Sequence, residues 1–140
     1  EIDFSNMTLA FLGDSITYGY VTKQGGQYEN PYPKLVGQIL GAETSFNYGV
    51  GGSTLTNGEK KYKPFVDRYL QMDENIDIIG VMGGTNDWAR NIPLGSIDDT
   101  DATTITSLLL IKALVAPCLN SSISSLIEAS FSIYVSLLGT

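Results

Sequence analysis

A serine that can act as a nucleophile follows the mostly apolar residues 7–12, inside the motif Gly-Asp-Ser-Ile-Thr at residues 13–17. The end of a strand, where the chain turns into a helix, is a typical position for a serine that attacks a carbonyl carbon. Such a serine normally loses its proton to a histidine, and the 140-residue chain contains no histidine. Glycine, aspartate and serine also suit an ordinary turn and helix cap, so Ser15 taken alone fits either interpretation.

Two more glycine-rich polar turns follow candidate strands later in the chain. Residues 47–54 (Asn-Tyr-Gly-Val-Gly-Gly-Ser-Thr) come after a short stretch with an apolar tendency. Residues 83–88 (Gly-Gly-Thr-Asn-Asp-Trp) come after the strongly apolar residues 76–82. Because the carboxyl ends of parallel strands meet at one edge of a sheet, where ligands bind, we expect the three turns to lie together.

Three groups in these turns suit the stabilisation of a negatively charged oxygen. Ser15 offers a backbone N–H beside its hydroxyl, Gly52 offers an N–H that no side chain obstructs, and Asn86 offers an uncharged amide. Each donor aimed at the oxyanion of a tetrahedral intermediate raises the rate by about 10²- to 10³-fold. The alternatives are a plain loop at Gly52 and a turn or helix cap at Asn86. The three groups together favour an oxyanion hole.

The three blocks resemble those of the SGNH hydrolases, also called GDSL esterases and lipases. The resemblance implies that Ser15 is the nucleophile and one oxyanion donor, and that Gly52 and Asn86 are the other two donors. It implies supporting roles for three neighbouring residues, namely Gly13, Asp14 and Gly84. The expected activity is that of a lipase, an esterase or an acetyl-sugar esterase, which forms an acyl-enzyme on Ser15 without a cofactor. The expected partner is a small-molecule ester.

The family's last block, Asp-x-x-His near the C-terminus, has no counterpart in the chain. We therefore expect weak or no turnover, although substrate binding and an oxyanion hole alone retain roughly 10³- to 10⁴-fold catalysis over water. The alternative is a non-catalytic relative that binds a carbohydrate or an acyl group. A third interpretation is a partly folded fragment whose apolar tail drives association. The motifs do not encode which ester is the substrate.

Other catalytic and binding motifs fit the chain poorly. No serine has glycine at both offsets of the Gly-x-Ser-x-Gly elbow, and no phosphate loop or dinucleotide fingerprint is complete. The acidic residues 98–101 lack the ligand spacing of an EF-hand, so a solvated helix cap is the preferred interpretation. No metal site is expected, because zinc would have only Cys118 and no histidine.

The chain is acidic, with a formal net charge of −7 and a pI near 4.3. Nucleic-acid binding is not expected, because phosphate recognition needs clustered basic residues. The one short basic run, Lys60, Lys61 and Lys63, is interpreted as a solvated face. The single cysteine excludes an internal disulfide. No signal peptide is visible, which leaves the localisation open between the cytoplasm and secretion after processing, and the oligomeric state is open too.

The elements that must position the three turns alternate between strand and helix. We expect three strands, at residues 8–12, 44–48 and 76–82. The last is apolar and β-branched, as in a strand buried on both faces. Helices are expected over Tyr32–Leu40 and residues 65–72. This alternation predicts an α/β fold with a parallel sheet and flanking helices. The resemblance implies the flavodoxin-like three-layer SGNH architecture, with an incomplete or atypical C-terminal part.

Aromatic residues near the first and third turns are candidates for substrate binding. Residues 18–30, rich in glycine and glutamine, are expected to form a loop beside the site. Tyr18 and Trp88, together with Tyr20 and Tyr28, suit an acyl or sugar pocket. Core packing or anchoring of the loop fits these residues equally well.

The chain is expected to be one domain over residues 1–140, with a family-like part at 1–101 and an atypical tail at 102–140. The tail is apolar and rich in serine, with one Lys and one Glu, whereas residues 1–101 contain seven basic and fourteen acidic residues. A helix is expected over residues 103–116, and the serines and Glu128 argue against a membrane span. We expect that a frameshift, gene-model error or truncation replaced the family's native C-terminal sequence. Sequencing the reading frame tests this expectation.

Overall fold

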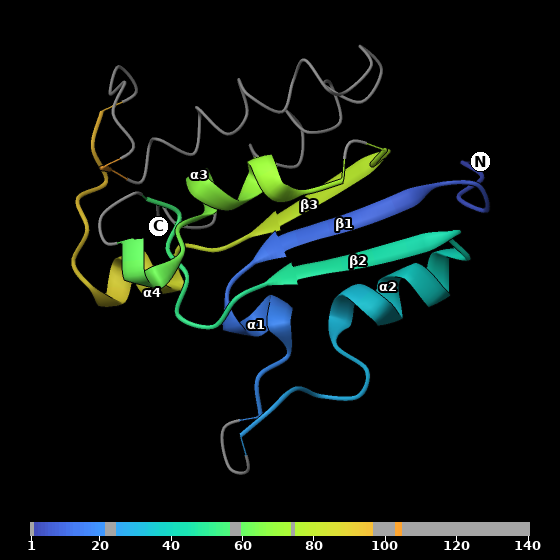
Figure 1. The fold of residues 1–140 in the computed structure, drawn as a ribbon, viewed down its shortest axis with the longest axis horizontal. Coiled ribbons are helices and arrows are strands. Elements are labelled where there is room, and N and C mark those ends of the chain that lie inside the picture. Colours follow the sequence, from blue (N-terminus) through green and yellow to red (C-terminus); the bar gives the residue numbers. More distant parts are fainter. Residues whose placement is uncertain (1, 22–24, 57–59, 74, 97–102, 105–140) are drawn as a thin grey trace, which may run out of the picture.

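The computed structural model of the protein describes residues 2–21, 25–56, 60–73, 75–96 and 103–104. Its centre is a sheet of three parallel strands (Figure 1), which are β1 (Thr8–Gly13), β2 (Thr44–Gly49) and β3 (Ile78–Met82). The strand order is β2-β1-β3, so β1 lies between the other two. The expected α/β fold with a parallel sheet is confirmed.

The carboxyl ends of the three strands are level with one another. Gly13, the last residue of β1, pairs with Gly49 of β2 and with Met82 of β3. The chain therefore leaves all three strands at one edge of the sheet, on the left in Figure 1, and each polar turn begins there. This edge is the usual position of ligand sites in parallel sheets.

Helices cover both faces of the sheet. These helices are α1 (Ser15–Tyr18), α2 (Tyr32–Leu40) and α3 (Phe65–Arg68). A fourth helix, α4 (Thr85–Ala89), lies beyond the carboxyl ends of the strands (Figure 1), and the chain also forms the short 3₁₀ turns η1 (Lys60–Tyr62) and η2 (Tyr69–Gln71). Successive side chains of a strand point to opposite faces, so Phe11 and Leu12 face different helices. Phe11 packs edge-on against Tyr32 of α2, with ring centroids 5.5 Å apart. Leu12 belongs to a core cluster with Phe65 of α3. The result is three layers, as the flavodoxin-like architecture requires.

The core cluster supports the carboxyl edge of the sheet. Leu12, Leu55 and Phe65 form it, and burial of each such side chain contributes about 1.5–3 kcal/mol. A Cβ added to Gly83 would lie only 2.6 Å from Cζ of Phe65, so glycine is needed where the third turn crosses this ring. The core thereby fixes the start of the third turn.

The strands at residues 8–12 and 44–48 are confirmed, and each extends by one glycine, Gly13 and Gly49. The single helix expected at residues 65–72 is wrong in its length, because α3 ends at Arg68 and the chain continues as η2. The expected helix Tyr32–Leu40 has the bounds of α2.

The third strand differs from expectation in two ways. β3 begins at Ile78, two residues later than expected, and just before it the Asp77 side chain accepts a hydrogen bond from the Thr8 N–H at 2.8 Å. Burial on both faces is also wrong, since Val81 and Met82 are 39% and 37% exposed. Within the described residues β3 pairs with β1 alone and forms an edge of the sheet, which leaves these side chains partly uncovered.

Some expectations fall on residues outside the described ranges. These are the acidic residues 98–101, the helix over residues 103–116 beyond Thr104, and nearly all of the tail at residues 102–140. Among the described residues, no helix is both long enough and apolar enough to cross a membrane.

Candidate active site

The first turn holds Ser15 at the start of α1. Asp14 caps this helix, since its buried Oδ1 accepts a hydrogen bond from the Ile16 N–H at 2.9 Å. Ser15 is the first residue of the helix and half-buried, and an N–H at this position has no acceptor inside the helix. Within the described ranges, no group forms a hydrogen bond with the Ser15 hydroxyl. Both the hydroxyl and the N–H are therefore available to a ligand.

The α1 helix lies directly on the end of β2, which fixes the position of Ser15. Asn47 Nδ2 donates a hydrogen bond to the Thr17 carbonyl at 2.8 Å, and Asn47 Oδ1 accepts one from the Gly49 N–H at 2.9 Å. A Cβ added to Gly49 would overlap the backbone nitrogen of Tyr18. Only glycine permits this close approach of the helix to the strand.

The second turn bends back against the first. The Val50 N–H donates to the Gly13 carbonyl at 3.0 Å, and the Ser53 N–H closes the turn on the Val50 carbonyl at 3.2 Å. Gly52, inside this turn, has a φ of +74°, a left-handed conformation that glycine adopts without strain. The half-buried Gly52 thus lies in a turn tied to the residue that precedes the Asp14–Ser15 pair.

The third turn delivers the Asn86 amide to the other two. Gly84, with a φ of +106°, precedes α4, and Asn86 is the second residue of this helix. Asn86 Nδ2 donates to the Ser53 carbonyl at 2.8 Å and lies 3.5 Å from Asp14 Oδ2. The first distance is that of an ordinary hydrogen bond and the second exceeds it. One amide hydrogen is therefore only weakly engaged and can turn toward a substrate oxygen.

Asp87 ties the third turn to the segment after the second. Its carboxylate is fully buried and accepts hydrogen bonds from the Leu55 N–H at 2.9 Å and the Thr56 N–H at 3.1 Å. Buried carboxylates of this kind are stable only when their oxygens are satisfied. Asp87 therefore has a positioning role, with no oxygen directed to a substrate.

A buried guanidinium group connects the ends of β1 and β2. Arg68 Nη2 donates to the Gly13 carbonyl and to Ser53 Oγ, both at 2.9 Å, and Nη1 donates to the Tyr48 carbonyl. Burial lowers the pKa of Arg68 to about 10, a decrease that the Asp14 carboxylate opposes. The group is therefore positively charged at neutral pH and binds the strand ends as a cation.

Motif reasoning missed Arg68 and Asp87. A signal for Arg68 was present in the sequence, because it is a charged residue inside the otherwise mostly apolar residues 65–72. A signal for Asp87 was its place inside the third block, beside Asn86. Neither signal identifies the carbonyl or N–H groups that these side chains bind, because those belong to distant turns.

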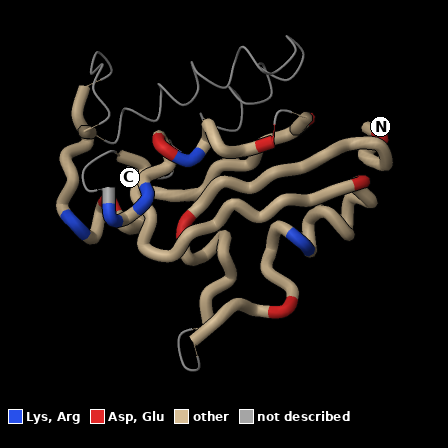
Figure 2. Tube along the Cα trace, in the orientation of Figure 1, with Lys and Arg blue, Asp and Glu red and all other residues tan. Residues whose placement is uncertain are grey.

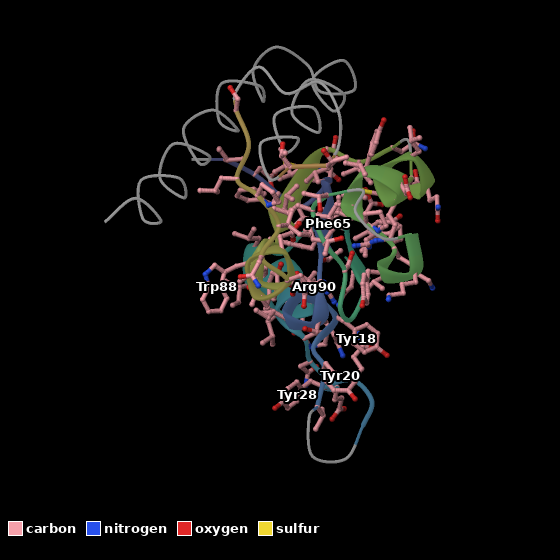
Figure 3. The ribbon with its side chains drawn as sticks, turned by 90° about the vertical axis from the view of Figure 1, so that its left-hand side faces the viewer. Tyr18, Tyr20, Tyr28, Phe65, Trp88 and Arg90 are labelled. Carbon is pink, nitrogen blue, oxygen red and sulfur yellow. The ribbon has the colours of Figure 1, made fainter. Side chains whose placement is uncertain are left out.

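The aromatic candidates do not gather at one place (Figure 3). Trp88 is 79% exposed on α4, whereas Tyr18 is half-buried in α1. In Figure 3, which faces the carboxyl edge, Arg90 lies between these two residues, and the exposed Tyr20 and Tyr28 lie farther along the loop. A pocket lined by Tyr18 and Trp88 therefore stays a prediction. Within the described ranges, no group of three or more His, Cys, Asp or Glu residues is arranged to hold a metal ion.

Solved structures resemble the chain over much of its length. One crystal structure is 31% identical to this chain in sequence and superimposes on it with a TM-score of 0.71. The match covers 82% of this chain and 53% of the chain in that crystal structure. A Lactobacillus plantarum protein is 32% identical to this chain, with a TM-score of 0.65, and the match covers 82% of this chain and 51% of that protein's chain. A possible lipase from Chitinophaga pinensis is 27% identical to this chain, with a TM-score of 0.53, and the match covers 73% of this chain and 40% of the lipase chain. The chain thus spans about half the length of the first two relatives.

The sequence matches one protein family over most of its length. The GDSL-like lipase/acylhydrolase family matches residues 11–129, which continues past residue 101, the expected end of the resemblance. No curated protein is significantly similar in sequence. Because the match includes the three turns and well over half of the chain, this protein belongs to the GDSL-like lipase/acylhydrolase family.

Proposed function

We propose that Ser15 hydrolyses small carboxylic esters through an acyl-enzyme, and that this chain turns over slowly because it contains no histidine. The observation that carries the proposal is the position of the Asn86 amide. It binds the Ser53 carbonyl, next to Gly52, and lies 3.5 Å from the carboxylate of Asp14, next to Ser15. One side chain thereby links the turn of the nucleophile with the turn of the second oxyanion donor. Similarity to a possible lipase supports an ester substrate.

In the proposed reaction, Ser15 Oγ attacks the carbonyl carbon of the ester and passes its proton to a hydroxide ion, which becomes water. As the new Oγ–C bond forms, the π electron pair moves to the carbonyl oxygen. The N–H groups of Ser15 and Gly52 and the Asn86 amide donate hydrogen bonds to this oxyanion. When the oxyanion collapses, the C–O bond to the alcohol breaks, and the alkoxide takes a proton from water.

In the second half of the reaction, hydroxide hydrolyses the acyl-serine. A hydroxide ion adds to the acyl-serine, the same three donors stabilise the oxyanion, and the bond to Ser15 Oγ breaks. Ser15 takes back a proton from water, and the carboxylic acid leaves. A histidine normally accelerates both halves by moving these protons, which is why we expect a low rate here.

Hydrolysis of p-nitrophenyl acetate tests the proposal on the whole chain and on Ser15→Ala. We expect the wild-type rate to exceed that of Ser15→Ala, whereas Ser5→Ala, a serine before β1 at the opposite end of the sheet, keeps the wild-type rate. Imidazole added to the solution supplies a base, so it should raise the Ser15-dependent part of the rate as its neutral form grows with pH. Equal rates for wild type and Ser15→Ala, with and without imidazole, would exclude Ser15 as the nucleophile.

A non-catalytic relative that binds a carbohydrate or an acyl group is the second candidate. The absence of histidine from the chain favours it. This candidate predicts ligand binding without any Ser15-dependent hydrolysis, so the same assay separates the two functions.

A further inference from the structure

Charged side chains are distributed unevenly between the two ends of the sheet. Acidic residues precede the strands at the amino end, namely Asp3, Glu43 and Asp77. Basic positions lie around the carboxyl end (Figure 2). Contacts with the second turn and with Tyr62 place Lys61, Lys63 and Arg90 there. Of the described acids nearer to this end, Asp67 is exposed on α3, whereas Asp14 and Asp87 are buried and bind backbone N–H groups. Among the residues that the structure describes, the solvent-facing charges around the candidate active site are therefore mostly basic, and such charges attract anions.

Arg90 places its guanidinium group beside the second turn. A Cβ added to Gly52 would lie 3.7 Å from Arg90 Nη2, which is an ordinary van der Waals contact. The guanidinium group therefore lies next to the Gly52 backbone. Nη1 of the same group lies 3.5 Å from the Asn86 carbonyl oxygen. Figure 3, which faces the carboxyl edge, shows Arg90 near the centre of this end of the molecule. A cation thus lies beside the backbone of Gly52, which is one proposed oxyanion donor, and beside the backbone carbonyl of Asn86, whose side-chain amide is another.

The Tyr62 ring lies against this guanidinium group and also against a second cation. Arg90 Cζ lies 3.8 Å from the centroid of the Tyr62 ring, a distance typical of stacking between a guanidinium group and an aromatic ring. Lys61 Nζ lies 4.7 Å from the same centroid. A second positive charge therefore lies near the Arg90 guanidinium group, and both charges attract an anion bound beside them.

We propose that Arg90, supported by Tyr62 and Lys61, binds a carboxylate or phosphate group carried by the ester substrate. The inference rests on the proposed ester hydrolysis at Ser15. A guanidinium group donates two parallel hydrogen bonds to the oxygens of either anion, and the contact with the Tyr62 ring restricts its movement. A neutral alkyl group gains no such contact at this position, so the substrate class is anionic esters rather than neutral lipids.

The basic run at Lys60, Lys61 and Lys63 is exposed at Lys61 and Lys63, in agreement with the solvated face expected from the sequence. The structure adds Arg90, which comes from the end of α4 and reaches the run through Tyr62. In the proposed anion site, this basic run forms one side and Arg90 forms the other. Sequence spacing alone does not reveal this pairing.

Equilibrium binding to the Ser15→Ala chain tests the inference without turnover. The probes are para-acetoxybenzoate, para-acetoxyphenyl phosphate and the neutral methyl ester of the first. We expect the two anionic probes to bind roughly tenfold more tightly than the neutral one at low salt, with a preference that shrinks as salt is added. Arg90→Met should abolish the preference, Arg90→Lys should restore part of it, and Lys34→Met, on α2, should leave it unchanged.

The outcomes separate this inference from the proposed hydrolysis. Equal affinities for charged and neutral probes, or an anion preference that persists in Arg90→Met and in Lys61→Met, would overturn the Arg90 site and leave the hydrolysis assay untouched. Preference for only one of the two anions identifies which group the site binds and supports the inference. An anion preference lost in Arg90→Met, beside equal hydrolysis by wild type and Ser15→Ala, would keep the anion site and reject the nucleophile. Circular dichroism of each variant confirms that the fold is retained.

Discussion

The Asn86 side chain touches the turns of both other proposed oxyanion donors. Its amide binds the Ser53 carbonyl at 2.8 Å and approaches the carboxylate of Asp14 at 3.5 Å. An amide suits this place because it donates to a carbonyl, tolerates a nearby carboxylate and carries no charge that would repel an oxyanion. The residue therefore has two separable effects, one on the geometry of the site and one on the charge that develops there.

Asn86→Asp replaces the donor with an acceptor of nearly the same shape. The new carboxylate loses the hydrogen bond to the Ser53 carbonyl and repels both Asp14 and the oxyanion. We expect the Ser15-dependent rate of p-nitrophenyl acetate hydrolysis to fall by about 10²-fold or more. The matched control is Asn91→Asp, at an exposed position just after α4, which should keep the wild-type rate. A rate for Asn86→Asp within about threefold of wild type would contradict the role of the amide.

At the scale of the elements, one buried cation and one glycine hold the strand ends in place. The guanidinium group of Arg68, on α3, binds carbonyls at the ends of β1 and β2 and in the segment before α3, including the Lys63 carbonyl at 2.9 Å. Gly49 lets α1 lie directly on the end of β2. Both features act on Ser15 through the backbone rather than by contact with a substrate.

Arg68→Met keeps the apolar stem of the side chain and removes the donors. The carbonyls of Gly13, Tyr48 and Lys63 lose their partner, so we expect the free energy of unfolding to fall by about 3 kcal/mol in urea denaturation. Arg90→Met, which removes a half-buried guanidinium group without this network, should change it by less than about 1 kcal/mol.

The charge of Arg68 is checked by the pH dependence of the stability difference between wild type and Arg68→Met. Burial lowers its pKa from the ordinary value of an arginine to about 10 in the folded chain. The unfolded chain therefore holds more protons only between these two pH values, and there the wild-type stability rises with pH. Below about pH 9 both states hold the proton, so the difference between wild type and Arg68→Met should stay constant from about pH 6 to about pH 9. A change of more than about 1 kcal/mol over this range would contradict a charged Arg68.

Gly49→Ala tests the contact between α1 and β2. The added methyl group overlaps the backbone of Tyr18, so the helix must move and carry Ser15 with it. We expect a loss of about 1–3 kcal/mol in the free energy of unfolding, together with loss of Ser15-dependent hydrolysis. Gly51→Ala is the matched control, because nothing lies within 4 Å of its Cβ position and its φ is not positive. If Gly49→Ala and Gly51→Ala behave alike, the close approach of α1 does not position Ser15.

At the scale of the whole molecule, the sequence predicts the arrangement of the sheet better than the network that supports it. Each polar turn follows an apolar run, so the alternation alone predicts that the three turns meet at one edge. The half-exposed β3 was not predictable, because an apolar β-branched run does not reveal whether the strand lies at an edge. The contacts of Arg68 and Arg90 were not predictable either, since their partners come from turns far away in the sequence.

The fold and the distribution of charge together connect the molecule to its proposed chemistry. The level ends of three parallel strands place Ser15, Gly52 and Asn86 at one edge, and the basic residues surround the same edge. The family match makes ester hydrolysis the expected reaction, and the chain spans about half the length of its solved relatives. The chemistry of this chain therefore depends above all on whether Ser15 itself reacts.

Peptide mapping by mass spectrometry after brief exposure to p-nitrophenyl acetate answers that question most directly. We predict one acetyl group on the peptide that contains Ser15, formed on the wild-type chain and on Gly51→Ala, and absent from Ser15→Ala. We also predict much slower labelling of Asn86→Asp, because the oxyanion of the acylation step loses a donor. Acetylation confined to lysine side chains, or a wild-type pattern identical to that of Ser15→Ala, would contradict the claim that Ser15 is the nucleophile.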